Sequence, residues 1–397
     1  MSANRPTHIL FLQSSSDLYG SDRCLINVAS GLLDKGYRVS AVLPYEGPLV
    51  GELVASGVRT WLLEPLVVRK QLLAGPAETA KFLWSVPGSV RALKKLMRQE
   101  QIDIVHSNTG VVIGGALAAR ISGLPHVWHF REVFSEFKKA WRWYEPFVSR
   151  HSARIVCISE AVRNQFVSDT ARGKSVIVYD GVTMPLIEES RLQWPGTEGD
   201  DNQATRDHDS FNILCFGRIN PPFKGQDILV QATRKLIDMG IPARTTFVGD
   251  VFPGKENLRE DLKSLIAALE LEDYVTMAGF REDATSWIDD CDVAVIPSKH
   301  PEPFGIVVLE AFARGKPVVG SDIGGIPEMI TDGENGLLVP PADPGALAQA
   351  LEKLYRDRDL GRRLARSGWK TVRDVFSPEQ AVDQLSGIYQ EILAAKN

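Results

Sequence analysis

Short apolar runs that alternate with helical stretches limit most strictly how this chain can fold. Runs too short for helices suit buried parallel strands, and they stand at 8–12, 38–43, 58–63, 102–106, 126–130, 154–158 and 176–179, then at 211–216, 245–248, 275–278, 292–296 and 335–339. Helical stretches between them include 22–34, 79–98 and 226–239. This alternation predicts an α/β protein with doubly wound parallel sheets. At 397 residues the chain exceeds the size of one core, so two domains are expected.

Composition and cysteine usage exclude several classes of protein. Hydrophobic residues make up 44% of the chain, as in ordinary globular proteins. No apolar run approaches the roughly 18–20 residues of a membrane span, and the apolar part of the N-terminal MSANRPTHILFLQSSS is too short for a signal peptide. Cys24, Cys157, Cys215 and Cys291 lie far apart without a C-x-x-C pair, which predicts neither disulfides nor a zinc site and fits a reducing cytoplasm.

Charge is distributed unevenly between the two halves of the chain. Residues 1–180 hold 22 Lys and Arg against 15 Asp and Glu, whereas residues 181–397 hold 23 against 35. Different partners are therefore expected for the two halves, and an anionic membrane surface is one candidate for the basic half. Nucleic acid is not expected, because no recognition motif or clustered basic helix accompanies the charge.

The segment from Pro297 to Gly320 gives the first indication of a site. A short strand leads into a proline-rich loop at 298–305, and a helix at 306–313 follows and ends before Gly315. The loop is therefore expected at the carboxyl edge of a parallel sheet, where α/β folds place their ligands. Free backbone N–H groups at the start of the helix favour an anion there.

Two carboxylates flank the start of this helix. Glu302 lies in the loop, and Glu310 lies inside an apolar helical sequence, where a charge without a partner is costly to bury. One interpretation is a solvated helix face. The other is a pair of carboxylates that accept hydrogen bonds from hydroxyl groups, as sugars and riboses supply.

A second candidate site follows the run at 211–216. Gly217 and Arg218 come directly after this strand, and Lys224 stands where the next helix opens. The guanidinium fork of an arginine and the point charge of a lysine form a suitable pair for a diphosphate. Surface cations in an ordinary loop are the alternative interpretation.

Together these motifs resemble one family of enzymes. The Glu302-x7-Glu310 spacing within PEPFGIVVLEA looks like the motif of retaining glycosyltransferases of the GT-B fold, above all glycosyltransferase family 4. The G-R-x5-K-G sequence that contains Arg218 and Lys224 resembles the donor-diphosphate site of the same family. The resemblance spans the chain and is most specific over 215–340. It implies two Rossmann-like doubly wound domains that face each other across a cleft, with the nucleotide-sugar donor in the C-terminal domain.

The resemblance also implies roles for individual residues. Arg218 and Lys224 would neutralise the leaving diphosphate. Glu302 would hold hydroxyl groups of the sugar, and Glu310 those of the ribose. The other donor-binding positions that it implies are Phe304, Gly305, Ile306 and Val307, with their backbone N–H groups, and Phe280 and Arg281 beside the base. Retention implies attack from the face of the leaving group, with the leaving phosphate taking the proton of the acceptor.

Gly20 lies in the loop after the first strand. In the family a Gly-rich loop at this place approaches the donor diphosphate, which makes Gly20 a donor-binding candidate. A plain turn, with Ser21 or Asp22 as the helix cap, is the alternative. The chain has no G-x-G-x-x-G sequence, so a dinucleotide-dependent oxidoreductase is disfavoured.

His129 lies near the end of the strand at 126–130. The family carries a histidine at the end of the corresponding strand that faces the donor sugar, and this resemblance assigns His129 to the active site. Arg131 and Glu132 are weaker neighbouring candidates. His106, also at a strand end, is the competing candidate, and a purely structural histidine is the alternative for His129.

The predicted domain plan has four parts. They are an N-terminal acceptor domain over 1–183, a linker over 184–210, a donor domain over 211–376 and a final helical segment, 377–397, that crosses back to the N-terminal domain as in GT-B folds. Segment 185–210 is polar and rich in Pro and Gly, which is typical of a linker or a disordered insertion.

Two segments of the basic half carry the membrane hypothesis. Segment 81–98 has five basic residues and no acidic one, and 136–150 interleaves basic with aromatic residues, as interfacial surfaces do. Two ordinary amphipathic helices that cover the sheet are the alternative. We expect a cytoplasmic protein, and the hypothesis would place it peripherally on the inner face of the membrane.

The sequence thus predicts a retaining glycosyltransferase that moves a sugar from a UDP- or GDP-linked donor to a glycan or lipid-linked acceptor, in bacterial surface polysaccharide synthesis by analogy. No metal or other cofactor is expected, because the family needs no metal and the D-x-D-like Asp290-Cys291-Asp292 precedes a strand at the edge away from the ligand. A nucleotide-sugar epimerase of the same fold and a non-catalytic nucleotide-sugar-binding protein are the alternatives.

Overall fold

The computed structural model describes residues 5–18, 20–68, 75–134, 138–182, 184–189, 192, 210–281 and 283–395. The chain divides into two compact units, one formed by Met1–Thr183 with Ser377–Asn397 and the other by Met184–Phe376. Most of the segment interpreted above as a linker lies outside the described residues. Each unit is built on one sheet of parallel strands, so the predicted doubly wound α/β architecture is confirmed.

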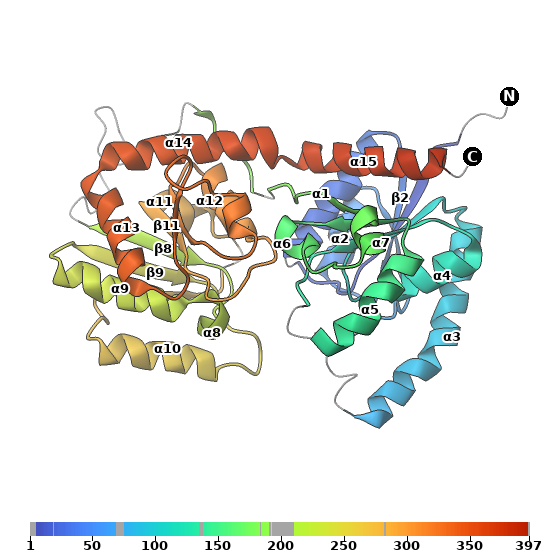
Figure 1. The fold of residues 1–397 in the computed structure, drawn as a ribbon, viewed down its shortest axis with the longest axis horizontal. Coiled ribbons are helices and arrows are strands. Elements are labelled where there is room, and N and C mark those ends of the chain that lie inside the picture. Colours follow the sequence, from blue (N-terminus) through green and yellow to red (C-terminus); the bar gives the residue numbers. More distant parts are fainter. Residues whose placement is uncertain are drawn as a thin grey trace. The chain divides into compact units, whose positions relative to one another are not determined.

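The first unit has a seven-stranded sheet with the order β3-β2-β1-β4-β5-β6-β7. Its strands are β1 (His8–Leu12), β2 (Arg38–Leu43), β3 (Arg59–Leu62), β4 (Ile104–Ser107), β5 (His126–Phe130), β6 (Arg154–Cys157) and β7 (Ser175–Ile177). Its helices are α1 (Gly20–Asp34), α2 (Pro48–Ala55), α3 (Pro76–Gln99), α4 (Gly114–Ser122), α5 (Lys138–His151), α6 (Glu160–Arg163), α7 (Asp169–Lys174) and α15 (Pro378–Ala394) (Figure 1). The strand order reverses between β1 and β4, which is where such sheets bind ligands.

The C-terminal helix α15 belongs to this first unit and lies beside α1 (Figure 1). Its buried face contributes Ala381, Val382, Leu385, Ile388, Tyr389 and Ile392 to the core that also contains β1 and α1. The two helices approach closely, since a Cβ atom on Gly31 would lie 2.7 Å from a methyl group of Val382. The last helix is therefore part of the first unit's core.

The second unit has a six-stranded sheet with the order β10-β9-β8-β11-β12-β13. Its strands are β8 (Phe211–Phe216), β9 (Ala243–Val248), β10 (Val275–Gly279), β11 (Val293–Ile296), β12 (Val318–Ser321) and β13 (Leu337–Val339). Its helices are α8 (Pro221–Lys224), α9 (Gln226–Asp238), α10 (Asn257–Ala268), α11 (Thr285–Asp290), α12 (Ile306–Ala313), α13 (Pro344–Arg356) and α14 (Arg358–Val375), with a 3-10 turn at Ile326–Glu328. Here the order reverses between β8 and β11.

The start of α1 differs from the sequence prediction. Ser21 or Asp22 was a candidate for the helix cap, but α1 begins at Gly20, so both residues lie inside its first turn. The buried Asp22 carboxylate instead accepts hydrogen bonds from Gln13 Nε2 and Ser15 Oγ, which fixes the loop after β1. A side chain that was a candidate for capping the helix therefore holds the preceding loop.

Helix α5 uses most of its aromatic residues for packing. Tyr144 stacks on Phe147 and meets Trp141 edge-to-face. These three rings also make edge-to-face contacts with the fully buried Trp128 and Phe130 of β5. Trp143 is the exception and is 80% exposed. The interpretation of 136–150 as a helix that covers the sheet thus accounts for these three aromatic side chains. Segment 135–137 lies outside the described residues.

Candidate active site

A pocket of about 210 Å³ lies at the carboxyl edge of the second unit's sheet. It is lined from the ends of β8 and β11, which are neighbours at the point where the strand order reverses. Arg218, Lys224, Glu302 and Val307 all line it, although up to 89 positions separate them in the sequence. Four of the residues predicted for donor binding thus meet at the position where α/β folds bind ligands.

Glu302 is held in place inside this pocket by two hydrogen bonds to one oxygen atom. Lys224 Nζ lies 2.5 Å from Glu302 Oε1, and Ser298 Oγ donates to the same oxygen at 2.7 Å. The Glu302 side chain is only 9% exposed, whereas that of Lys224 is 36% exposed. The lysine therefore neutralises a nearly buried carboxylate, while the exposed part of the lysine side chain faces the pocket and solvent.

The turn that carries Lys224 is packed against the end of β11. Lys224 is the last residue of the short helix α8, and Gly225 follows with a φ of 70°. A Cβ atom on Gly225 would lie 1.8 Å from the carbonyl oxygen of Pro297, so only glycine fits. The N–H groups of Lys299 and His300 donate to Phe223 O, which ties the two loops together. The sequence placed Lys224 at a helix opening, and the structure adds a helical turn before it.

A second pair of glycines supports the Glu302 loop from behind. Gly324 has a φ of 65°, and a Cβ atom there would lie 2.5 Å from both the backbone N and O of Glu302. Gly325 N donates to Glu302 O at 2.8 Å. In the sequence these two adjacent glycines stand in a loop that opens a helix, and taken alone they predict a close approach of backbone to a ligand. The close approach that requires glycine is instead to the backbone of the Glu302 loop.

The loop after β8 positions Arg218. Buried Gln226, at the start of α9, donates from Nε2 to Arg218 O at 3.0 Å and accepts the N–H of Asn220 at 3.3 Å. The exposed Arg218 guanidinium lies over the ring of Phe252, 3.5 Å from its centroid. The backbone of the loop is therefore fixed while the cation is presented on one side of the pocket.

Cys215 is the only thiol among the pocket-lining residues. Burial raises the pKa of the Cys215 thiol to about 12, so the group is protonated at neutral pH. A thiolate nucleophile is therefore not available at this position.

The remaining predicted residues of the second unit are not among those that line the pocket. Phe304, Gly305 and Ile306 form the turn into α12, in which Gly305 has a φ of 98°, and the first N–H groups of this helix have no partner within it. Glu310 lies one turn further along α12 and is partly exposed. Phe280, which is 70% exposed, and Arg281 follow β10 at one side of the sheet and do not line the pocket.

In the first unit His129 lies in β5 and is buried with His106 of the neighbouring strand β4. His106 Nε2 is 3.3 Å from His129 Nδ1, and His106 Nδ1 is 2.6 Å from the hydroxyl oxygen of Tyr389 in α15. His129 Nε2 is buried without a hydrogen-bond partner. Burial, together with the nearby Arg131 charge, lowers the pKa of both imidazoles well below the usual value, so both are neutral.

The loops at the carboxyl edge of the first sheet are joined by polar contacts. Buried Arg131 pairs with the Asp180 carboxylate, and its Nε donates to Asn108 O at 3.2 Å. Asn108 Nδ2 in turn donates to Gln13 Oε1 at 3.0 Å. Arg131 and Asn108 therefore link the segments that follow β1, β4, β5 and β7. Desolvation raises the pKa of the neighbouring Glu132 carboxyl.

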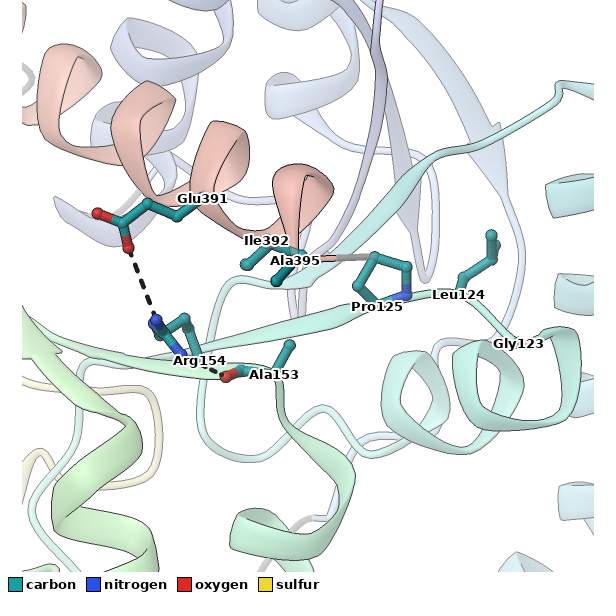
Figure 2. A pocket seen from close by; sticks show the side chains of 8 residues that line it. All are labelled: Gly123, Leu124, Pro125, Ala153, Arg154, Glu391, Ile392 and Ala395. Carbon is teal, nitrogen blue, oxygen red and sulfur yellow. Dashed lines mark hydrogen bonds and ion pairs between the residues drawn. The ribbon is translucent and has the colours of Figure 1, made fainter. Parts of the chain in front are cut away.

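Gly20, the remaining predicted residue of the first unit, is exposed at the start of α1. A larger pocket of about 420 Å³ also belongs to this unit, and Figure 2 shows it between the end of α15 and the starts of β5 and β6. Pro125, Ile392 and Ala395 line it, and Arg154 and Glu391 form an ion pair of 3.6 Å at its edge. It lies at the amino edge of the sheet, away from the ligand side, and contains none of the predicted residues.

Among residues that the structure describes, no group of three or more His, Cys, Asp or Glu side chains could hold a metal ion. The Asp292 carboxylate of the D-x-D-like sequence accepts the N–H of Asn212 at 2.7 Å and lies 3.8 Å from Arg358. The Asp292 carboxylate, directly before β11, thus makes its contacts within the protein.

Several residues of the two sites were not found from the sequence. Ser298 and Gln226 hold Glu302 and Arg218 through contacts that depend on loop geometry, which no spacing rule predicts. Phe252 lies in the loop after β9, and its contact with Arg218 joins two loops of the sheet edge. Tyr389 lies on the apolar face of a terminal helix. A hydroxyl group in that apolar setting was the one feature of the sequence that could have indicated a buried hydrogen bond.

Two family models match this chain. The one described as "Glycosyltransferase Family 4" matches residues 19–184, and the one described as "Glycosyl transferases group 1" matches residues 210–357. Together they cover most of both units. An alpha-D-kanosaminyltransferase of Streptomyces kanamyceticus is 35% identical over 63% of this chain and 64% of that protein. A lipopolysaccharide core biosynthesis glycosyltransferase, LpsE of Rhizobium meliloti, is 35% identical over 62% of this chain and 66% of that protein.

A solved structure extends the likeness over nearly the whole chain. Anabaena HepE in complex with UDP superposes with a TM-score of 0.80 at 23% identity, covering 97% of this chain and 100% of that one. At this level of identity the likeness concerns the fold.

Proposed function

For a chain that belongs to the family 4, group 1 glycosyltransferases and has their GT-B fold, we propose retaining transfer of a sugar from a UDP- or GDP-linked donor to a glycan or lipid-linked acceptor. One observation carries this proposal. The second unit gathers two cations and a held carboxylate in one pocket at the carboxyl edge where its strand order reverses. Such a pocket suits a diphosphate and the sugar attached to it.

The diphosphate would lie against Arg218 and Lys224. Lys224 has three N–H bonds and uses one toward Glu302, so two remain for phosphate oxygens. The N–H groups at the start of α12 would add fixed positive dipoles. Glu310, on the same helix, would accept hydrogen bonds from the ribose hydroxyls, and Phe280 and Arg281 would lie toward the base.

Transfer would proceed on one face of the sugar. As the bond between the anomeric carbon and the phosphate oxygen breaks, its electron pair goes to the leaving diphosphate, whose growing charge Arg218 and Lys224 stabilise. The acceptor hydroxyl attacks from the same side and gives its proton to that phosphate oxygen. Glu302 would hold sugar hydroxyls, and His129 would donate a hydrogen bond to the sugar.

The nature of the substrates is a further part of the proposal. HepE, which has the same fold, was also solved in complex with UDP-glucose, and LpsE is named for lipopolysaccharide core synthesis. These relatives favour a UDP-sugar donor and a surface polysaccharide or its lipid-linked precursor as acceptor. We propose that the reaction requires no bound metal and takes place in the cytoplasm.

Peripheral contact with an anionic membrane is proposed for the first unit. On α3 the side chains of Leu83 and Trp84 are exposed, Trp84 by 89%, and α5 exposes Trp143. Basic residues accompany them on α3, among them Lys94 and Lys95. No helix among the described residues is long and apolar enough to span a membrane. Co-sedimentation with phosphatidylglycerol vesicles should fall when Trp84 and Trp143 are both replaced by Ser, and absence of binding by the unmodified protein would reject the contact.

Donor binding by variants of the pocket tests the central proposal. We expect thermal shifts with a UDP- or GDP-sugar, and a ligand present at 100 times its Kd adds about 2.7 kcal/mol of stability. Lys224→Ala should weaken donor binding by roughly 10- to 100-fold, because a charge-assisted hydrogen bond is worth about 1.5–3 kcal/mol. Lys299→Ala is the matched control, since Lys299 pairs with Asp227 at 2.8 Å but does not line this pocket.

Each outcome of this experiment separates the alternatives. An unchanged donor Kd in Lys224→Ala would reject the assignment of the pocket. Donor turnover to an epimeric sugar without an acceptor would indicate an epimerase, and donor binding without turnover in the presence of any acceptor would indicate a binding protein.

A further inference from the structure

We propose that Tyr389, through His106, fixes His129 in the tautomer that carries its proton on Nε2, which makes Tyr389 a positioning residue for the transfer reaction. This inference rests on the proposed function, because it concerns how His129 presents a donor to the sugar. It assigns a role to the C-terminal helix that neither family membership nor the pocket of the second unit requires.

Three side chains from three elements form one row of hydrogen bonds within the first unit. The hydroxyl oxygen of Tyr389 in α15 is 2.6 Å from His106 Nδ1, and His106 Nε2 is 3.3 Å from His129 Nδ1. Tyr389 and His106 are fully buried, and His129 is 1% exposed. Water therefore does not compete for these ring nitrogens, and each bond constrains the next.

The direction in which hydrogen bonds are donated along this row follows from counting the protons on the three side chains. A neutral imidazole has one N–H donor and one acceptor nitrogen, whereas a phenol has one proton to donate. If Tyr389 donates to His106 Nδ1, then His106 carries its proton on Nε2 and donates it to His129 Nδ1. His129 must then carry its own proton on Nε2. One tyrosine hydroxyl thus determines two tautomers.

The opposite direction leaves more buried groups without partners. His129 would donate from Nδ1 to His106, and His106 from Nδ1 to Tyr389, so the phenol proton and the His129 Nε2 lone pair would both be unsatisfied. In the proposed direction the single unsatisfied donor is the N–H at His129 Nε2, which is the atom found buried without a partner. Because buried donors without acceptors are costly, the row should run from Tyr389 to His129.

The electrostatic surroundings keep all three groups in the required protonation state. Burial raises the pKa of Tyr389 well above its usual value, so the phenol keeps its proton. Burial and the Arg131 charge lower the pKa of both imidazoles, so neither gains a second proton at neutral pH. The row therefore ends in a neutral N–H donor, which suits a sugar oxygen better than a buried cation would.

The test uses the full-length protein and two tyrosine variants. Tyr389→Phe removes the hydroxyl and keeps the ring in the core. Tyr37→Phe is the matched control, because Tyr37 also bonds to α15, through Ser386 Oγ at 2.8 Å, but does not contact His106. The measurements are imidazole ¹⁵N–¹H NMR spectra at pH 7.5, which identify the protonated nitrogen of each histidine, together with turnover and with the Kd for UDP and GDP.

The expected result is a proton on Nε2 of both His106 and His129 in the unmodified protein. In Tyr389→Phe the two rings should become mixtures of tautomers, and kcat should fall about tenfold while the nucleotide Kd stays unchanged. Tyr37→Phe should alter neither the tautomers nor kcat.

Two results would overturn the inference: a proton on Nδ1 of His129 in the unmodified protein, or equal losses of kcat in the two variants. If Tyr389→Phe does not fold, the spectrum of the unmodified protein still decides the direction of the row. The NMR spectra identify the tautomers in the absence of donor and acceptor substrates. Failure of donor binding or turnover would therefore refute the proposed function without deciding which tautomers the two histidines adopt.

Discussion

His126 provides a quantitative test of how the first unit is built. This residue begins β5 and is almost fully buried, with Nδ1 3.1 Å from His151 O and Nε2 2.9 Å from Ser107 Oγ. The neutral ring satisfies both contacts, by donating from Nδ1 to the carbonyl and accepting the serine proton at Nε2. Burial accordingly lowers the pKa of His126 from 6.5 to about 3.

The sign and size of the effect follow from proton linkage. Below pH 6.5 the unfolded chain binds a proton at His126 that the folded protein does not bind, so stability falls as the pH falls toward the folded pKa. Each pH unit in that range costs about 1.4 kcal/mol, and the His126 contribution lost between pH 7.5 and pH 5.5 is about 1.4 kcal/mol. His126→Gln removes this dependence and also removes hydrogen bonds at every pH.

The assay is urea unfolding of the unmodified protein and His126→Gln at pH 7.5, 6.5 and 5.5, fitted with one transition for each unit. The unmodified first unit should lose about 1.4 kcal/mol more than the variant over this range. Comparing the two proteins cancels the contributions of His106 and His129, and that of Glu132, whose raised pKa acts in the opposite direction. An equal pH dependence in both proteins would show that His126 titrates normally when folded, and would refute the account of its burial.

Two further predictions concern the packing of the sites. Gly225→Ala should destabilise the second unit and weaken donor binding, because the new methyl group meets Pro297 O. The control is Gly240→Ala, at a φ of 74° with open space around it. This variant should bind the donor normally and lose only about 1 kcal/mol of stability, the cost of the backbone conformation. Asp180→Asn should destabilise the first unit by about 3 kcal/mol in urea unfolding, since it leaves the buried Arg131 charge without its partner. The exposed Asp383, paired with Lys35, should tolerate the same change with a loss below about 1 kcal/mol. Similar losses at Asp180 and Asp383 would contradict this reading.

The fold was predictable because its signals are local. Buried parallel strands read as short apolar runs, and the observed bounds of β1, β2, β5 and β8 coincide with the predicted ones. The meeting of Arg218 and Glu302 was also accessible, since both follow strands whose carboxyl ends share one sheet edge. Strand periodicity and the position of a side chain after a strand are properties of short segments.

What could not be predicted depends on contacts between distant segments. The two prolines near Glu302 indicated a loop but not that Ser298 would bond to the carboxylate. Gly324 indicated a close approach of backbone but not its partner, which is the Glu302 loop. The bond between His106 and Tyr389 joins residues 283 positions apart, and only the packing of α15 on the first unit's sheet brings them together.

The ion pair between Lys224 and Glu302 suggests how the pocket would favour the transition state. In the free protein Lys224 shares its charge with Glu302, whose carboxylate is nearly buried. On the proposed mechanism the leaving diphosphate gains negative charge as the bond to the sugar breaks, so its attraction for Lys224 grows during the reaction. An interaction that strengthens in this way raises kcat more than it tightens binding.

Glu302→Gln separates these two effects, because it keeps the size of the side chain and removes its charge. Lys224 would then face bare nucleoside diphosphate without competition, so the Kd for UDP or GDP should decrease or stay constant. Turnover of the sugar donor should fall by about tenfold or more, since the sugar hydroxyls lose a charged acceptor worth about 1.5–3 kcal/mol. Calorimetry with the nucleotide and steady-state kinetics with the donor measure the two quantities. An increased Kd for the nucleotide with an unchanged kcat would mean that Glu302 only shapes the diphosphate site. The assignment of its carboxylate to the sugar would then have to be abandoned.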